Sequence, residues 1–415
     1  MAALFSCLSA FFALCLLQAV AENQPPKNRM QLASSISQFE TRLREFFHSS
    51  VSNTRYSDWE TRFQKLALDL FQLQFASNEA YRDLCSARGV NPALVTDWKQ
   101  IPAAPASAFK ELELSCLPAV ERTRVFYSSG TTRERPSRHF HNDRSLALYE
   151  NSAASWFGKT FGLFNAANAE VPTSPFTMIF LTPQPGAVPN SSLAHMFATL
   201  NQKWGGGRSH FIGEVSPRGV WTIDFKAATK ALEAECAAGR PLFLIGTAFS
   251  FVHLLDFFAE SDLRFQLRAG SRVMETGGYK GQSRVVPRSE LHLLIGERLG
   301  VPPSQIVCEY GMCELSSQAY AMALTDADTR SSGRIFDFPP WAKTMIISPE
   351  TGTEVSEGET GLIRVFDLAN VCSVMAVQTE DLGIRHGDGF ELVGRAENSE
   401  ARGCSLMASS LREAL

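Results

Sequence analysis

Short apolar runs that alternate with helical stretches constrain the fold of this 415-residue chain most strongly. Turn residues bound each run, and the stretches between several of them, such as 225–238 and 289–299, have helical periodicity. Strands that alternate with helices predict a mostly parallel sheet with both faces covered by helices. The predicted strands lie at residues 125–127, 176–181, 242–245, 272–274, 306–308 and 344–347.

The two ends of the chain differ from this middle part. Residues 35–90 carry apolar stripes at helical spacing and are predicted to form structural helices. After about Arg334, short strands and glycine turns predict hairpins in a smaller β-rich part. We therefore expect an α/β fold with three segments: a leader and linker at 1–29, one large domain at 30–394 whose β-rich part is about 335–394, and a hinge with a short tail at 395–415.

The first 21 residues form an apolar, uncharged leader. It ends in Ala-Val-Ala, as a signal-peptidase site does, but it lacks the basic start of a signal peptide. It is also about long enough to span a bilayer. A third interpretation is a true start at Met30, where an amphipathic helix begins. Because the chemistry expected below needs a nucleotide found inside cells, we expect a cytoplasmic protein, with export or membrane tethering through residues 1–21 as the alternative.

Composition narrows the range of partners. The net charge is −4 and there is no strongly basic segment, so neither nucleic acid nor membrane binding is expected of the main domain. The nine cysteines are scattered, without a C-x-x-C pair or a Cys/His cluster at zinc spacing, which predicts reduced thiols. His139 and His141 would face one side of a strand, but no third metal ligand accompanies them.

A cluster of small hydroxyl residues directly follows the predicted strand at 125–127. Small side chains let backbone N–H groups approach an anion, and hydroxyls add donors, so the cluster is suited to a polyphosphate. A Ser/Thr turn that caps a helix would explain it equally well. A Walker A loop is excluded, because the chain contains no G-x-x-x-x-G-K-[ST]. The cluster comprises Ser128, Ser129, Gly130, Thr131 and Thr132.

Two further motifs follow predicted strands. Gly277 and Gly278, after RVMET, would allow the backbone to approach a ligand closely. In CEYGMCE the predicted strand ends at Cys308, and the turn at Tyr310 and Gly311 could present an aromatic face to a base. Glu314 in the same motif could bind magnesium between phosphates, although an exposed Glu in an ordinary turn explains the pattern as well.

The order of the motifs is more informative than any single motif. The chain carries five motifs in a fixed order: SSGTT, GG, YGMCE, TED with Asp381, and GR with Arg395. This order resembles that of the adenylate-forming superfamily, which includes acyl- and aryl-CoA ligases, adenylation domains and luciferases. The phrases IPAAPASAFK, YSSGTT, SSLAHM, ETGGYKG, EYGMCELSSQ, TEDLG and RGCSL are similar to its acyl-protein synthetase branch, the long-chain fatty acid:protein ligases of bacterial bioluminescence operons and their relatives. The resemblance covers roughly residues 35–410.

The resemblance implies an activity, ATP and Mg²⁺ as cofactors, and a set of site residues. A fatty acid or other carboxylic acid would react with ATP to give an acyl-adenylate and pyrophosphate, and the acyl group would then pass to a thiol, releasing AMP. By the same resemblance, residues 128–132 would hold the ATP phosphates, and Glu314 would help bind Mg²⁺. Asp381 would hold the ribose hydroxyls, and Arg395 would contact the nucleotide near the hinge. The adenine and acyl pocket would be bordered by Gly277, Gly278, Tyr310 and Gly311.

The chain departs from the superfamily pattern in two places. The phosphate loop normally continues with a glycine and a later lysine, whereas here Arg133 follows, so Arg135 or Arg138 would have to supply the cation. Arginine and lysine are not equivalent at a phosphate. Most superfamily members also carry a further C-terminal lobe with a catalytic lysine, which is largely reduced in the acyl-protein synthetase branch and is absent from this sequence after Arg395.

The resemblance gives Cys404 a specific role. In this family a cysteine near the C-terminus accepts the acyl group and passes it to a reductase partner, and Arg402 would favour the thiolate of Cys404. An inert thiol packed under a tail helix is the alternative. Two other functions stay open: an acyl- or aryl-CoA ligase of the phenylacetate type, and a degenerate, non-catalytic relative that binds a ligand or a partner protein.

Overall fold

The computed structural model describes residues 26–51, 58–128, 135–165, 168–172, 176–217, 219–279, 283–322 and 334–395. The predicted leader at 1–21, residues 129–134 of the Ser/Thr-rich loop, and the tail with Cys404 lie outside the described residues.

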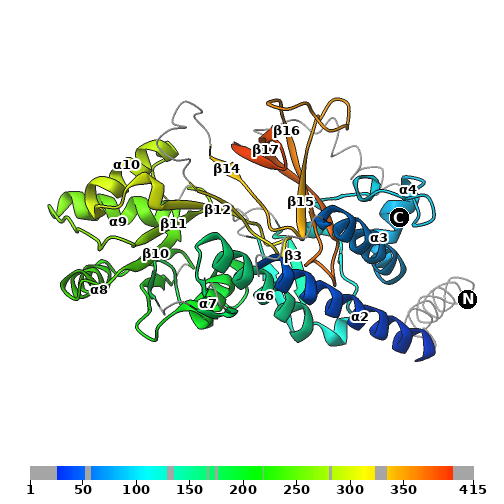
Figure 1. Ribbon diagram of the computed structural model, residues 1–415, viewed down its shortest axis with the longest axis horizontal. Helices are drawn as coiled ribbons and strands as arrows, with labels where there is room; N and C mark the ends of the chain where they lie inside the picture. The colour runs from blue at the N-terminus through cyan, green and yellow to red at the C-terminus, as the bar shows by residue number, and fades with distance from the viewer. Residues whose placement is uncertain are drawn as a thin grey trace, which may run out of the picture.

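A six-stranded, mostly parallel sheet organises the middle of the chain (Figure 1). Its strands follow the order β13-β12-β11-β10-β6-β7, and only β13 runs antiparallel to its neighbour. The strands predicted at 176–181, 242–245 and 272–274 are confirmed. The strand predicted to end at Cys308 continues to Tyr310, so Tyr310 lies in a strand rather than in a turn. The bounds are β6 (Thr177–Phe180), β7 (His210–Phe211), β10 (Leu242–Thr247), β11 (Arg272–Thr276), β12 (Ile306–Tyr310) and β13 (Ala319–Ala321).

Helices cover both faces of this sheet, as predicted. Alternate strand residues point to opposite faces. Leu244 and Val273 pack in one apolar cluster with helices α8 (Phe225–Ala237), α9 (Ala248–Glu260) and α10 (Arg288–Leu299). Their neighbours Phe243 and Met274 pack in another cluster with α6 (Asp143–Thr160) and α7 (Ser192–Trp204). The α/β fold class follows from this layering.

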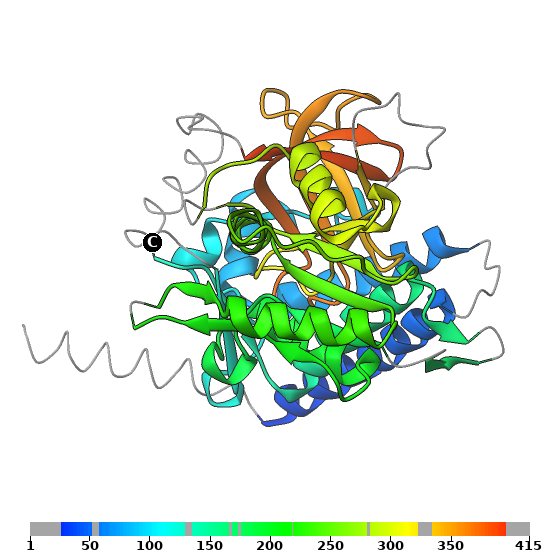
Figure 2. The ribbon, with the colours of Figure 1, turned by 90° about the vertical axis from the view of Figure 1, so that its left-hand side faces the viewer.

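A second sheet is built mainly from the C-terminal residues. Its strands follow the order β14-β18-β17-β16-β15, all antiparallel, and β1 adds to β17 in parallel. Figure 2 shows its orange and red strands above the green strands and helices of the parallel sheet. The bounds are β1 (Ala104–Pro105), β14 (Ile335–Phe336), β15 (Ala342–Ile347), β16 (Thr360–Asp367), β17 (Ala376–His386) and β18 (Gly389–Arg395). The domain boundaries expected from the sequence stay a prediction.

The N-terminal helices pack against this second sheet. Phe39 and Phe63 share one buried cluster with Val365 and Phe366 of β16. The side-chain amide of Gln74 donates to the backbone oxygen of Asn370 at 2.7 Å. The helices are α2 (Pro26–Val51), α3 (Trp59–Ser77), α4 (Glu79–Ala87) and the short α5 (Ala108–Glu111).

Three two-stranded ribbons and four 3₁₀ turns complete the described structure. The ribbons pair β2 (Arg124–Tyr127) with β3 (Arg138–His141), β4 (Phe164–Asn165) with β5 (Asn168–Pro172), and β8 (Gly213–Val215) with β9 (Trp221–Ile223). The 3₁₀ turns are Trp98–Gln100, Ala119–Glu121, Pro185–Ala187 and Pro303–Gln305. Within the described ranges, no helix has both the length and the apolar character needed to cross a bilayer.

Candidate active site

Two serines close the base of the Ser/Thr-rich loop. Strands β2 and β3 pair up to Tyr127 and Arg138. Beyond this pair, the backbone N–H of Ser128 donates to the backbone oxygen of Ser137 at 3.2 Å, and the N–H of Ser137 donates to Oγ of Ser128 at 2.9 Å. Ser128 thus marks the start of a closed loop, whereas the other predicted phosphate-binding residues, Ser129, Gly130, Thr131 and Thr132, lie outside the described residues.

The base of this loop is fastened to the segment that carries Glu314. Nδ1 of His139 lies 2.8 Å from the backbone oxygen of Cys313. Because a carbonyl only accepts, Nδ1 carries a proton; burial lowers the pKa of His139 to about 4, so the ring is neutral. Ser137 hydrogen-bonds to the Glu314 carboxyl group, whose pKa burial raises. Ser137, at the base of the loop, and Glu314 are therefore direct neighbours.

Tyr310 and Asp381 meet directly although 71 residues separate them. The Tyr310 hydroxyl donates to Oδ2 of Asp381 at 2.8 Å. The Tyr310 ring is buried edge-on against three phenylalanines, at centroid distances of 5.3 to 6.3 Å. Tyr310 thus offers mainly its hydroxyl rather than the exposed aromatic face expected of a turn. Burial raises the pKa of Asp381, and Asp381 in turn helps to raise the pKa of Glu314, so these carboxyl groups are close neighbours.

The predicted glycines lie at the same edge of the parallel sheet. The register pairs Thr276 with Glu309, which places Gly277 beside Tyr310. Gly277 has a φ of +65°, which disfavours other residues, and a Cβ added to it or to Gly278 would meet no atom within 4 Å, so both border open space. A Cβ on Gly311 would lie 2.5 Å from Oε1 of Glu309, so a larger residue here would have to displace the Glu309 carboxyl group.

Arg395 ends β18 next to Asp381. The two residues pair across β17 and β18, and the Arg395 guanidinium donates to Glu380 at 2.5 Å. Its charge counteracts, but does not overcome, the effect of burial on the pKa of Asp381. Arg395 therefore lies beside Asp381 at the last of the described residues.

The two arginines that could replace the missing lysine differ in their surroundings. Arg138 lies 3.4 Å from Glu113, which also accepts from Arg122 at 2.5 Å, so the charge of Arg138 is shared with a carboxylate. Arg135 is exposed and makes no hydrogen bond or salt bridge with the residues that the structure covers, although its charge helps to lower the pKa of Glu113. Arg135 is therefore the freer of the two cations.

A buried network that the sequence reasoning missed fixes the backbone around Glu314. Oδ2 of Asp367 accepts the N–H groups of Ser316 and Ser317, each at 2.8 Å, and Oδ1 accepts the Ser317 hydroxyl at 2.7 Å. The Asn370 side chain donates to the backbone oxygen of Glu314 at 2.8 Å. The available signal was a pair of polar residues, Asp367 and Asn370, inside the apolar run VFDLANVC.

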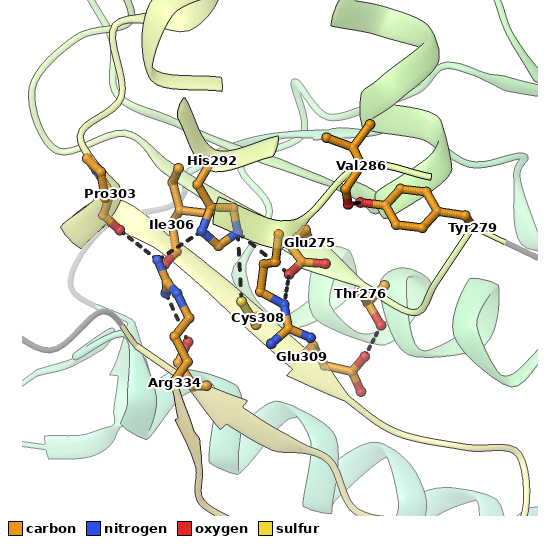
Figure 3. Close-up of polar contacts among 12 residues, drawn as sticks. Glu275, Thr276, Tyr279, Val286, His292, Pro303, Ile306, Cys308, Glu309 and Arg334 are labelled. Carbon is orange, nitrogen blue, oxygen red and sulfur yellow. Dashed lines mark hydrogen bonds and ion pairs between the residues drawn. The ribbon is translucent and has the colours of Figure 1, made fainter. Parts of the chain in front are cut away.

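A second buried cluster lies between β11, β12 and α10 (Figure 3). Nε2 of His292 lies 3.9 Å from Sγ of Cys308 and 3.6 Å from Oε1 of Glu275. These sulfur, nitrogen and oxygen atoms all lie within 4.8 Å of one another, a spacing that suits a metal ion. The sequence could not reveal this cluster, because its members come from β11, α10 and β12 with no common local spacing.

The proton on His292 argues against a metal in this cluster. Nη2 of Arg334 lies 3.2 Å from Nδ1 of His292, and because arginine only donates, Nδ1 must accept. The proton of the neutral ring then lies on Nε2, the atom that a metal would need, and points toward Glu275 and Cys308. Nε of Arg288 lies 3.4 Å from Oε1 of Glu275, and burial raises the pKa of the Cys308 thiol. The cluster therefore serves as a hydrogen-bonded attachment of α10 to the sheet.

Comparison with known proteins supports the resemblance seen in the sequence. Residues 44–415 match the family described as "Acyl-protein synthetase, LuxE". The chain is 24% identical to the long-chain-fatty-acid–luciferin-component ligase of Vibrio harveyi over 375 residues, covering 85% of this chain and 89% of that protein. It is also 24% identical to the protein of the same name from Aliivibrio fischeri over 388 residues, covering 86% and 92%.

Solved structures show the same fold. An open conformation of 2-hydroxyisobutyryl-CoA ligase in complex with 2-HIB-AMP and CoA superposes with a TM-score of 0.58 at 14% identity, covering 83% of this chain and 79% of that one. The same enzyme in its postadenylation state gives 0.57, covering 83% and 71%. These findings confirm the predicted resemblance, the adenylate-forming fold class and the assignment as a ligase. The chain belongs to the acyl-protein synthetase, LuxE, family.

Proposed function

We propose that this protein is an ATP-dependent ligase that activates a long-chain fatty acid as its acyl-adenylate and transfers the acyl group to a protein cysteine thiol. Family membership and the names of the two bacterial relatives support the reaction class. The observation that carries the proposal is the meeting of distant motifs: Ser137 bonds to Glu314, and Tyr310 bonds to Asp381. Segments that make such contacts can bind one ligand together.

The predicted residues divide into two groups by what they can hold. Asp381, oriented by the Tyr310 hydroxyl, would accept hydrogen bonds from the ribose hydroxyls, with Gly277 and Gly278 leaving room for the nucleotide. Ser128 and the loop that it opens would hold the phosphates. Glu314 has the chemistry of a Mg²⁺ ligand, and it would exchange its bond with Ser137 for the ion. Mg²⁺ would neutralise phosphate charge.

The reaction needs positioning and neutralisation of charge more than covalent chemistry by the protein. A carboxylate oxygen of the acid attacks the α-phosphorus of ATP, and the bond to pyrophosphate breaks. The thiolate sulfur then attacks the acyl carbon, and the bond to AMP breaks. Of the two arginines at the loop, Arg135 is the better candidate to neutralise phosphate charge, because Glu113 engages Arg138. Arg395 would contact the nucleotide beside Asp381.

Cys404 is the proposed acyl acceptor, and a reductase is the proposed partner that consumes the thioester. Cys404→Ser should abolish labelling of the protein by a radioactive fatty acid while leaving pyrophosphate release in place. Labelling that persists in this variant would reject Cys404 as the acceptor. Turnover that requires CoA would instead identify a CoA ligase.

The test of the activity is pyrophosphate release by the full-length protein with ATP, Mg²⁺ and a panel of fatty acids. Asp381→Asn should lower kcat/KM by about 10- to 100-fold, because charge-assisted hydrogen bonds contribute about 1.5–3 kcal/mol. Asp388→Asn is the matched control, since Asp388 is exposed in the turn between β17 and β18 of the same sheet. Background release with every acid, together with no binding of ATP to the folded protein, would select a non-catalytic relative.

A cytoplasmic location is proposed on the need for ATP, with export or tethering through residues 1–21 as the alternative. N-terminal sequencing of the native protein distinguishes a start at Met30, cleavage after Ala21 and retention of the leader. Cleavage after Ala21 would overturn the cytoplasmic assignment.

A further inference from the structure

A cavity of about 660 Å³ lies between helices α2, α6 and α7, which Figure 1 shows side by side. None of the residues assigned to the nucleotide or the acyl acceptor lines it. Helix α6 contributes Ala147 and Ala154, whose short side chains leave room between the flanking helices. The volume falls within the range of about 300–1,000 Å³ that is usual for small-molecule sites.

Two cations without partners face this cavity from different helices. Arg44 of α2 and Lys203 of α7 both line it, and neither makes a hydrogen bond or salt bridge with any residue in the described part of the chain. Lys203 has only a contact with the Trp204 ring, at 5.9 Å from its centroid. By contrast, Arg42 of α2 and Arg144 of α6 are paired at 2.7 Å, Arg42 with Asp69 and Arg144 with Glu40.

The other lining groups favour an anion with an apolar body. Oδ1 of Asn151 accepts from the Ser155 hydroxyl at 2.9 Å, which leaves the amide N–H₂ of Asn151 to donate. Glu150 contributes a carboxylate, and its Oε1 is engaged by Nε2 of His195 at 2.9 Å. Val51 and Phe164 supply apolar surface. Arg44, Lys203 and the Asn151 amide therefore offer donors to the cavity, while one carboxylate oxygen of Glu150 is already engaged.

We propose that this cavity binds an organic phosphate monoester. The dianionic phosphate matches the two charges of Arg44 and Lys203, and charge-assisted hydrogen bonds to phosphate are the strongest that these side chains make. The Asn151 amide donates to a further oxygen, and the organic group packs against Val51 and Phe164. Binding here is independent of the nucleotide site, so it does not require the proposed ligase activity.

Calorimetric titration of the full-length protein with phenyl phosphate tests the proposal, with inorganic phosphate and phenol as matched probes. Phenyl phosphate should bind saturably and more tightly than inorganic phosphate, whereas phenol should not bind. The double variant Arg44→Gln/Lys203→Gln should lose about tenfold or more in affinity. Lys230→Gln is the matched control, because Lys230 is exposed on α8 without a partner among the described residues.

A steric variant distinguishes binding inside the cavity from nonspecific attraction by surface charge. Ala147→Phe fills the space and keeps both cations, and it should also abolish binding while the melting temperature stays close to that of the wild type. Excess ATP should not displace phenyl phosphate. Displacement by ATP, unchanged binding in the double variant, or no saturable binding of phenyl phosphate would each overturn the proposal. Binding of a polyglutamate peptide in place of phenyl phosphate would indicate an acidic protein partner instead.

Discussion

Two glutamates on neighbouring strands of the parallel sheet have opposite electrostatic surroundings. Glu275 of β11 points toward α10, and Glu309 of β12 points toward α6 and α7; both are almost fully buried. Burial acts to raise the pKa of Glu275, but the hydrogen bond with His292 and the charge of Arg288 together hold it below its usual value. Burial and the negative charge of Glu275 raise the pKa of Glu309 to about 7, and the hydrogen bond from the neutral Thr276 hydroxyl offsets them only in part.

The comparison shows that the extent of burial alone does not decide whether a carboxyl group inside the protein is ionised. The same two strands carry both groups, and only the charged partners differ. The Glu275 face is a charged attachment for α10, whereas the Glu309 side chain lies next to Gly311, one of the residues predicted to border the nucleotide. A group that titrates near neutral pH therefore lies one residue from the proposed nucleotide contacts.

The largest expected effect on stability comes from replacing each of the two glutamates with glutamine. Glu275→Gln should lower the free energy of unfolding by about 2–3 kcal/mol at neutral pH, because it leaves Arg288 and the His292 N–H without a charged acceptor; the partial exposure of Arg288 limits the loss. Glu309→Gln keeps the volume and an acceptor for Thr276, and at neutral pH it should raise the free energy of unfolding rather than lower it, because burial disfavours a carboxylate at this position. Urea unfolding followed by tryptophan fluorescence measures both, and equal losses would contradict the distinction.

The two glutamates should also affect the pH dependence of stability in opposite directions. The pKa of Glu309 is raised in the folded state, so its contribution is present at about pH 4.5 and is lost as the pH rises to about 7, at up to about 1.4 kcal/mol per pH unit. Glu309→Gln should therefore lose less stability than the wild type over this window. Glu275, with a lowered pKa, contributes above its unfolded value and loses that contribution only as the pH falls further.

Unfolding curves at a series of pH values check this prediction. Parallel curves for the wild type and Glu309→Gln between about pH 5 and pH 7 would show that Glu309 does not titrate there.

The smallest expected effect concerns metal binding at the Glu275 face. The wild-type protein should show no thiolate-to-cobalt absorption when Co²⁺ is added, because Arg334 keeps the His292 proton on Nε2. Arg334→Met frees Nδ1 to take the proton and should allow weak Co²⁺ binding through Cys308. His292→Ala in the same background is the control, and thiolate absorption in the wild type would show that the cluster does bind metal.

Local patterns predicted much of the fold but only part of the site. Strands and helices that alternate, such as 242–245 and 225–238, could be identified because buried runs and helical stripes leave a signal within a few residues. The site pairs Tyr310 with Asp381 and Ser137 with Glu314, and such contacts depend on how the two sheets are placed. The order of motifs pointed to these residues only through resemblance to a family.

The remaining features left no local signal. The Glu275–His292–Cys308 cluster comes from three elements, and the position of the His292 proton depends on a hydrogen bond from Arg334. The orientation of Tyr310 depends on three phenylalanines, two of which, Phe336 and Phe338, follow β13, while Phe390 belongs to β18. Sequence periodicity describes which face of an element is buried, but it does not say which distant residue it will contact.

The pairing of β1 with β17 has a consequence for biosynthesis. The hydrogen bond from Gln74 to Asn370 spans 296 residues, and Ala104 pairs with Val377, so early segments complete their contacts only with strands translated almost last. Chains whose contacts join residues so far apart in the sequence fold slowly, and apolar surface stays uncovered until those contacts form. The nascent N-terminal helices therefore keep their apolar faces uncovered until the partner sheet has been synthesised, and exposed surface of this kind is what chaperones protect from aggregation.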